Sequence, residues 1–134
     1  MAVAKKIDHV AIAVQDLNAA VRTFTNNFGF PVERSGEVPQ LNIRRAFLSI
    51  GDAFLELFQP TNDKNPGAKF IGERGEGMYL LSLEVDDLAA AATTLEAKGI
   101  KVTRQTLDGG LKLAFISPKV THGVLLQLIE HPHV

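Results

Sequence analysis

Two stretches of the chain share the same order of apolar and polar positions. Residues 7–14 and 79–85 are strand-like apolar runs, and each is followed by an aspartate placed to cap a helix. These aspartates, Asp16 and Asp87, lie 71 residues apart. The shared order indicates an internal repeat.

Each aspartate opens a stretch in which apolar residues recur at helical spacing until a glycine ends the pattern. The glycines are Gly29 in the first half and Gly99 in the second. The apolar positions are Leu17, Val21, Phe24 and Phe28 in the first half and Leu88, Ala92 and Leu95 in the second. We therefore expect one amphipathic helix in each half.

Three further strands are expected after each helix. The first is a short apolar run, at residues 30–32 and 100–102, and the other two form a hairpin. In the first half a Gly51-Asp52 pair marks the hairpin turn. The hairpin strands are residues 45–50 and 54–58 in the first half and 113–116 and 124–129 in the second.

The repeat predicts an α+β fold of two tandem βαβββ modules, forming a curved eight-stranded cup-shaped sheet with helices on its outer face. We expect a single domain, residues 1–134, with module one at about 6–60 and module two at about 78–131. In the linker, at about 61–77, Asn65-Pro66-Gly67 predicts a turn and residues 68–71 predict one helical turn.

Composition narrows the class of protein. The chain has no cysteine, which excludes disulfides, thiolate metal ligands and a cysteine nucleophile. Its net charge of −1, without a basic block, argues against a nucleic-acid partner. No apolar run is long enough to span a bilayer. We expect a soluble, cytoplasmic protein that does not bind membranes.

Strand alternation predicts which polar side chains face the concave surface. They include His9, Glu56 and Gln127, with Glu84 nearer the rim. A carboxylate between Leu55 and Leu57 costs several kcal/mol to bury unless it is paired, protonated or bound to a metal, so Glu56 is the strongest candidate. A purely structural hydrogen bond between His9 and Glu56 is the competing interpretation.

Further residues are expected to line a substrate pocket on the same face. One of the adjacent Arg44 and Arg45 must point inward, either to pair a substrate carboxylate or phosphate or to form a salt bridge across the sheet. The candidate pocket residues are Arg44, Phe54, Phe58, Leu80, Ser82 and Gln127. The tail histidines His131 and His133 are weak ligand candidates.

The segments IDHVAIAV, LELFQP, GEG, EVDD and GVLLQLIE, in this order, resemble the vicinal oxygen chelate superfamily of glyoxalases, bleomycin resistance proteins and dioxygenases. Within it the chain is most similar to the methylmalonyl-CoA epimerase family, over residues 6–130. The resemblance implies a homodimer. It also implies a divalent metal (Co, Ni, Zn, Mn or Mg) that chelates two substrate oxygens and stabilises an enolate.

The family's four ligand positions fall on His9, Glu56, Leu80 and Gln127. Leu80 has no donor atom, so the resemblance leaves His9, Glu56 and Gln127 as the tentative metal ligands. It also implies a glutamate base just after a proline before the third strand of the first half, where this chain has Gln40. These departures argue against methylmalonyl-CoA epimerisation itself.

Two functions remain open. The first is an epimerase/glyoxalase-like enzyme, an isomerase or lyase, acting on a small carbonyl compound such as an acyl thioester, keto acid or diketone. His9 and Glu56 would be catalytic, as metal ligands or as a metal-free acid/base pair. The second is a metal-free protein that binds or sequesters a small molecule, as resistance proteins do, which the apolar Leu80 favours.

Overall fold

The computed structural model describes residues 2–132, so His133 lies outside the described part. The chain divides into two compact units. The first unit is His9–Tyr79, and the second contains the residues from Leu80 onward together with those up to Asp8. No helix within residues 2–132 is long and apolar enough to cross a membrane.

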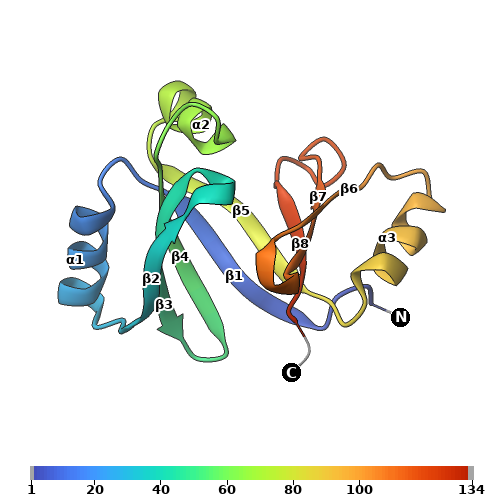
Figure 1. The fold of residues 1–134 in the computed structure, drawn as a ribbon, viewed down its shortest axis with the longest axis horizontal. Coiled ribbons are helices and arrows are strands. Elements are labelled where there is room, and N and C mark those ends of the chain that lie inside the picture. Colours follow the sequence, from blue (N-terminus) through green and yellow to red (C-terminus); the bar gives the residue numbers. More distant parts are fainter. Residues whose placement is uncertain (1, 133–134) are drawn as a thin grey trace. The chain divides into compact units, whose positions relative to one another are not determined.

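The first unit contains four strands in the order β2-β3-β4-β1 (Figure 1). Strand β1 runs parallel to β4, whereas β2 and β3, and β3 and β4, are antiparallel. The elements are β1 (Lys6–Ala13), α1 (Leu17–Phe28), β2 (Val32–Val38), the short 3₁₀ helix η1 (Pro39–Leu41), β3 (Ile43–Ile50), β4 (Ala53–Pro60) and α2 (Pro66–Arg74).

The second unit repeats this plan in the strand order β5-β8-β7-β6 (Figure 1). Strands β5 and β8 are parallel, and the other pairs are antiparallel. The elements are β5 (Gly77–Glu84), α3 (Leu88–Glu96), β6 (Thr103–Thr106), the short 3₁₀ helix η2 (Asp108–Gly110), β7 (Lys112–Ile116) and β8 (Leu126–Glu130). The α+β class and the βαβββ repeat are confirmed.

Both predicted helix caps are present. Asp16 Oδ1 accepts a hydrogen bond from the backbone N–H of Ala19 at 3.1 Å, and Asp87 Oδ1 accepts one from Ala90 at 3.0 Å. Gly29 ends α1 in the left-handed conformation, at φ 74°, which glycine adopts without steric cost.

A second anchor at each helix start was not predicted. The backbone N–H of Leu17 donates to Gln59 Oε1 at 2.9 Å, and that of Leu88 donates to Glu130 Oε1 at 2.8 Å. Both the donors and the acceptors are related by the 71-residue offset. Each half therefore ties its helix to its own last strand.

Each unit has its own apolar core, on the helix-facing side of its strands. In the first unit Leu48 and Leu57 are fully buried and pack with residues of α1. In the second unit Leu128, at 1% exposure, packs with Leu88 of α3. The alternation predicted for β4 is therefore correct. Phe28 is an exception, because it is 61% exposed and its ring stacks on Phe30.

The predicted turn at Asn65-Pro66-Gly67 is wrong, because these residues begin the nine-residue helix α2. Asn65 Oδ1 accepts from the N–H of Gly67 at 2.7 Å, and its amide donates to the carbonyl of Leu41. Asparagine at the cap followed by proline is a favourable helix start. A Cβ at Gly67 would lie 2.6 Å from a ring carbon of Phe58, so the helix approaches β4 closely here.

The short apolar runs after the helices lie mainly before the strands, and only Val32 of these runs belongs to a strand. Strand β2 begins only at Val32, and β6 begins at Thr103. Phe30 and Ile100 pack instead against the cores of their respective units. Packing of Phe30, and of Ile100 and Val102, against these cores explains the apolar character of these positions, whereas Val32 is exposed.

Candidate functional site

Strands β1, β3 and β4 of the first unit bring His9, Arg45 and Glu56 together. Glu56 Oε1 lies 3.5 Å from His9 Nε2, and Glu56 Oε2 lies 3.4 Å from Arg45 Nη1. The side chains of His9 and Glu56 are only 5% and 8% exposed, whereas that of Arg45 is 23% exposed. A buried carboxylate thus lies between an imidazole and a guanidinium.

Strand register places these groups on one face of the sheet. Glu56 lies opposite Phe47 of β3 and opposite Ala11 of β1. Because side chains alternate, Arg45 shares a face with Phe47, and His9 shares a face with Ala11.

The Phe47 ring is a central contact of this face. His9 and Phe54 meet it edge-on, with centroid distances of 5.4 and 6.0 Å. The Cζ atoms of Arg34 and Arg45 lie 4.5 and 4.9 Å from its centroid. An aromatic ring under a guanidinium favours the cation and restricts its orientation.

Of the two adjacent arginines, the structure places Arg45 beside Glu56, whereas Arg44 is exposed. A pocket role for Arg44 stays a prediction. The signal for Arg45 was present in the sequence, since a two-residue turn at Gly51-Asp52 sets the hairpin register. Counting back from that turn pairs Phe47 with Glu56, and Arg45 is two residues from Phe47.

The second unit holds three of the predicted pocket residues, Leu80, Ser82 and Gln127. Ser82 Oγ donates to Gln127 Oε1 at 2.7 Å, and both side chains are buried. Leu80 is also buried. The amide oxygen predicted as a metal ligand is therefore already hydrogen-bonded within its own unit.

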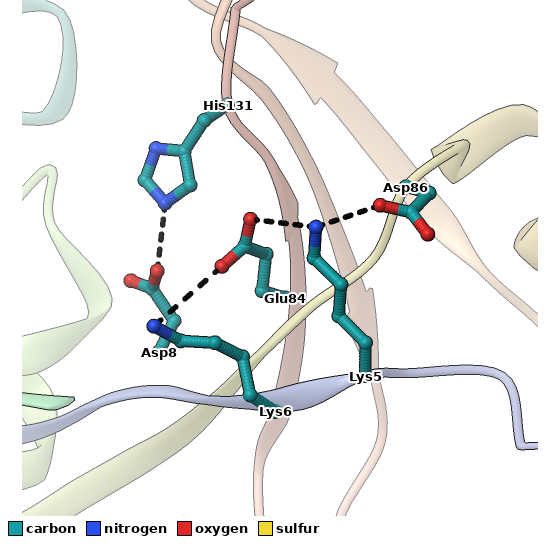
Figure 2. Close-up of polar contacts among 6 residues, drawn as sticks. All are labelled: Lys5, Lys6, Asp8, Glu84, Asp86 and His131. Atoms are coloured by element: carbon teal, nitrogen blue, oxygen red, sulfur yellow. Dashed lines mark hydrogen bonds and ion pairs between the residues drawn. The ribbon is translucent and has the colours of Figure 1, made fainter. Parts of the chain in front are cut away.

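A separate polar group of the second unit was largely missed from sequence (Figure 2). Asp8 Oδ1 lies 2.7 Å from His131 Nε2, a polar contact between residues 123 positions apart. Ligand atoms of Asp8, Glu84 and His131 all lie within 4.8 Å of one another, so this group can hold a metal ion.

Two lysines, Lys5 and Lys6, lie close to the Glu84 carboxylate. Lys5 Nζ lies 3.4 Å from Glu84 Oε2 and 2.7 Å from Asp86 Oδ1, and Lys6 Nζ lies 4.0 Å from Glu84 Oε1 (Figure 2). The hydrogen bond to Asp86 raises the pKa of Lys5 above its usual 10.5. Each carboxylate of this group thus already lies close to a nitrogen atom of a lysine or of His131.

Comparison with known proteins places the chain in a family. A model described as a glyoxalase-like domain matches residues 7–132, nearly the whole chain. The chain belongs to this glyoxalase-like family. Its βαβββ repeat is the expected architecture of the vicinal oxygen chelate fold.

Relatives of this glyoxalase-like domain include epimerases. It is 31% identical to human mitochondrial methylmalonyl-CoA epimerase over 127 residues, covering 92% of this chain and 72% of that protein. It is 30% identical to the ethylmalonyl-CoA/methylmalonyl-CoA epimerase of Cereibacter sphaeroides, covering 92% and 96%. These relatives support an enzyme of the epimerase/glyoxalase type.

A solved structure agrees with this placement. A Streptomyces coelicolor methylmalonyl-CoA epimerase variant in complex with 2-nitronate-propionyl-CoA matches with a TM-score of 0.91 at 29% identity. The match covers 98% of the glyoxalase-like domain and 97% of the Streptomyces chain. The fold is therefore shared over nearly the full length.

The donors that the glyoxalase-like domain offers in its first unit do not fit the divalent metal implied by the family. Both oxygens of Glu56 already face a partner, and one of these partners is the Arg45 cation. With a neutral imidazole, the charges of His9, Arg45 and Glu56 sum to zero. Hard divalent ions prefer sites with surplus carboxylate charge. The chemistry proposed below uses no metal.

The burial of Tyr79 in the first unit of the glyoxalase-like domain predicts how the stability of the fold changes at high pH. Its ring packs against Phe58 and Phe70 at centroid distances of 5.2 and 5.3 Å, and burial raises its pKa above the usual 10.0. Because the pKa is raised in the folded state, the contribution of the neutral phenol to stability is fully present below pH 10. This contribution is lost as pH rises through the folded-state pKa of Tyr79.

We therefore expect Tyr79→Phe to lose less stability than the wild type between pH 10 and 11. Tyr79 is the only tyrosine and the chain has no tryptophan, so tyrosinate absorbance reports this residue alone. An absorbance titration of folded and urea-unfolded protein measures the shift directly. Identical midpoints in the two states would contradict the prediction.

Proposed function

We propose that the chain is an epimerase/glyoxalase-type enzyme that moves a proton next to the carbonyl group of a small molecule. The substrate class is an acyl thioester, a keto acid or a diketone. The observation that carries the proposal is the buried Glu56 carboxylate, 3.5 Å from His9 Nε2 on one sheet face. Such a pair is costly to bury and is suited to general acid–base chemistry.

In this reaction the Glu56 carboxylate accepts a proton from the carbon beside the carbonyl. The C–H bond breaks, an O–H bond forms on Glu56, and the electron pair moves to the carbonyl oxygen as an enolate. His9 lies beside Glu56, where its imidazole can relay the proton. Return of the proton to the opposite face of the carbon gives the epimer, and return to a different atom gives an isomer.

The relatives support the reaction type, and we propose a substrate other than methylmalonyl-CoA. Gln127 occupies the position where the family resemblance implies a glutamate, and its amide oxygen accepts from Ser82. The acid/base work then depends on His9 and Glu56 of the first unit.

The implied homodimer stays a prediction that analytical ultracentrifugation checks.

The test is incorporation of solvent deuterium, followed by NMR in D₂O. The compounds are pyruvate, 2-oxobutyrate, methylmalonyl-CoA and pentane-2,3-dione, each incubated with the wild type and with the double variant His9→Leu/Glu56→Leu. We expect the wild type to accelerate exchange in at least one compound and the double variant to lose this acceleration. If the folded double variant exchanged deuterium at the wild-type rate, the proposal would be contradicted.

A sequestering protein is the second candidate, favoured by the buried, donor-free Leu80. It predicts that a compound binds, measured by calorimetry, and is recovered without deuterium. Binding without exchange across the panel would favour sequestration over catalysis.

A further inference from the structure

Among the described charged side chains around Phe47, positive charges outnumber negative ones. Arg34 lies opposite Phe47 on β2, and both Arg34 and Arg45 place their guanidinium carbons within 5 Å of the Phe47 centroid. Among the described residues, Glu56 is the acidic side chain in contact with Arg45. Two cations and one anion leave a charge of +1 with a neutral His9, which favours an anionic ligand.

We propose, resting on the function above, that Arg45 is the substrate-binding cation of this site and that the substrate is a 2-oxo acid. In the free protein Glu56 faces the guanidinium. When substrate binds, its carboxylate takes the place of Glu56 at Arg45, and the released Glu56 becomes the base.

The geometry of the ion pair supports an exchangeable partner. A charge-assisted N–H···O contact is usually about 2.7–2.9 Å long, and the Arg45–Glu56 contact is 3.4 Å. The Arg45 side chain is also 23% exposed, compared with 8% for Glu56, so a ligand can reach it. Arg45 is therefore weakly held by Glu56 and accessible.

The shape of a guanidinium selects the substrate class. Its parallel N–H donors form a planar fork that spans two oxygens, and it stays charged at all working pH values. In a 2-oxo acid, a carboxylate oxygen and the keto oxygen are neighbours and can accept from the two arms of the fork. A diketone lacks the charge, and a simple acyl thioester lacks the second, anionic oxygen.

The same contact assists the chemical step. Glu56 takes a proton from carbon 3 of the 2-oxo acid, so that a C–H bond breaks and an O–H bond forms. The electron pair forms the carbon–carbon double bond of the enolate, and the negative charge develops on the keto oxygen that faces Arg45. Return of the proton from Glu56 to carbon 3 restores both groups. No oxidant or further reactant is needed.

Oxalate is a suitable probe because it presents two neighbouring oxygens and resembles the enolate of a 2-oxo acid. Its affinity is measured by isothermal titration calorimetry on protein freed of metal with a chelating resin. We expect Arg45→Met to weaken binding at least tenfold and Arg45→Lys to weaken it less. Arg22→Met, which changes an exposed arginine of α1, should bind as the wild type does.

Glu56→Gln separates this proposal from a merely structural ion pair. If Glu56 competes with the ligand for Arg45, the variant should bind oxalate about three- to tenfold more tightly than the wild type. A structural pair predicts unchanged or weaker binding. Unchanged affinity in Arg45→Met, or no oxalate binding by the wild type, would overturn the proposal.

Removal of Arg45 leaves Glu56 without its cation. The double variant Arg45→Met/Glu56→Gln removes both charges of the pair and so avoids this cost. This variant should fold and still fail to bind oxalate. The two proposals can fail independently. Absence of deuterium exchange contradicts the enzymatic proposal, and oxalate binding that does not depend on Arg45 contradicts the present one.

Discussion

Glu56→Gln is expected to slow deuterium exchange into the best substrate by about 10²- to 10⁴-fold, the usual contribution of a general base. Glutamine has the shape of glutamate and can still accept a hydrogen bond from Arg45, but it cannot take a proton from carbon. The exchange rate is measured by NMR at saturating substrate, so that tighter binding does not mask the loss.

Glu33→Gln is the matched control, because Glu33 is an exposed glutamate of β2 in the same unit. It should exchange protons at the wild-type rate. Thermal unfolding of each variant establishes that loss of activity is not loss of fold. A folded Glu56→Gln with wild-type activity would show that another group is the base.

The largest effect on stability is expected from Leu57→Ala and Leu128→Ala. These leucines are 0% and 1% exposed, lie in the cores of the two different units, and are related by the 71-residue offset. Each substitution removes buried methyl groups and leaves a cavity, which typically costs about 2–5 kcal/mol of unfolding free energy.

Urea unfolding followed by circular dichroism measures both losses. If the halves unfold together, either variant shifts one shared transition, whereas independent halves would show two transitions and only one would move. Met78→Ala is the control, since Met78 is 69% exposed and should change stability by less than about 0.5 kcal/mol. A loss below about 1 kcal/mol in both core variants would contradict the assigned cores.

The repeat could be predicted because its signals are local. Asp16 and Asp87 each open a helix, Gly29 ends one, and Gly51 marks a hairpin turn, and each of these features depends on a few neighbouring residues. His9 and Glu56 could also be named as candidates, since a carboxylate between two strand leucines is unusual wherever it occurs. Their proximity follows from the parallel pairing of β1 with β4.

Other features depend on long-range geometry that no local pattern encodes. The contact of Asp8 with His131 joins residues near opposite ends of the given sequence. The anchoring of Leu17 by Gln59 requires the position of α1 relative to β4. Helix α2 was underestimated because asparagine, proline and glycine in succession also signal a turn, and the contact of Gly67 with β4 is not visible in the sequence.

The hydrogen bonds at the two helix starts show which positions the two halves share. Asp16 and Asp87 are identical, and Gln59 and Glu130 accept equivalent hydrogen bonds from the first residue of each helix. In contrast, His9 corresponds to Leu80, and Glu56 corresponds to Gln127. The two halves thus share the residues that hold their helices and differ at the positions proposed for chemistry. For protein engineers, positions 80, 82 and 127 are therefore natural sites for a mutant library, since the second copy already folds without the residues that define the first.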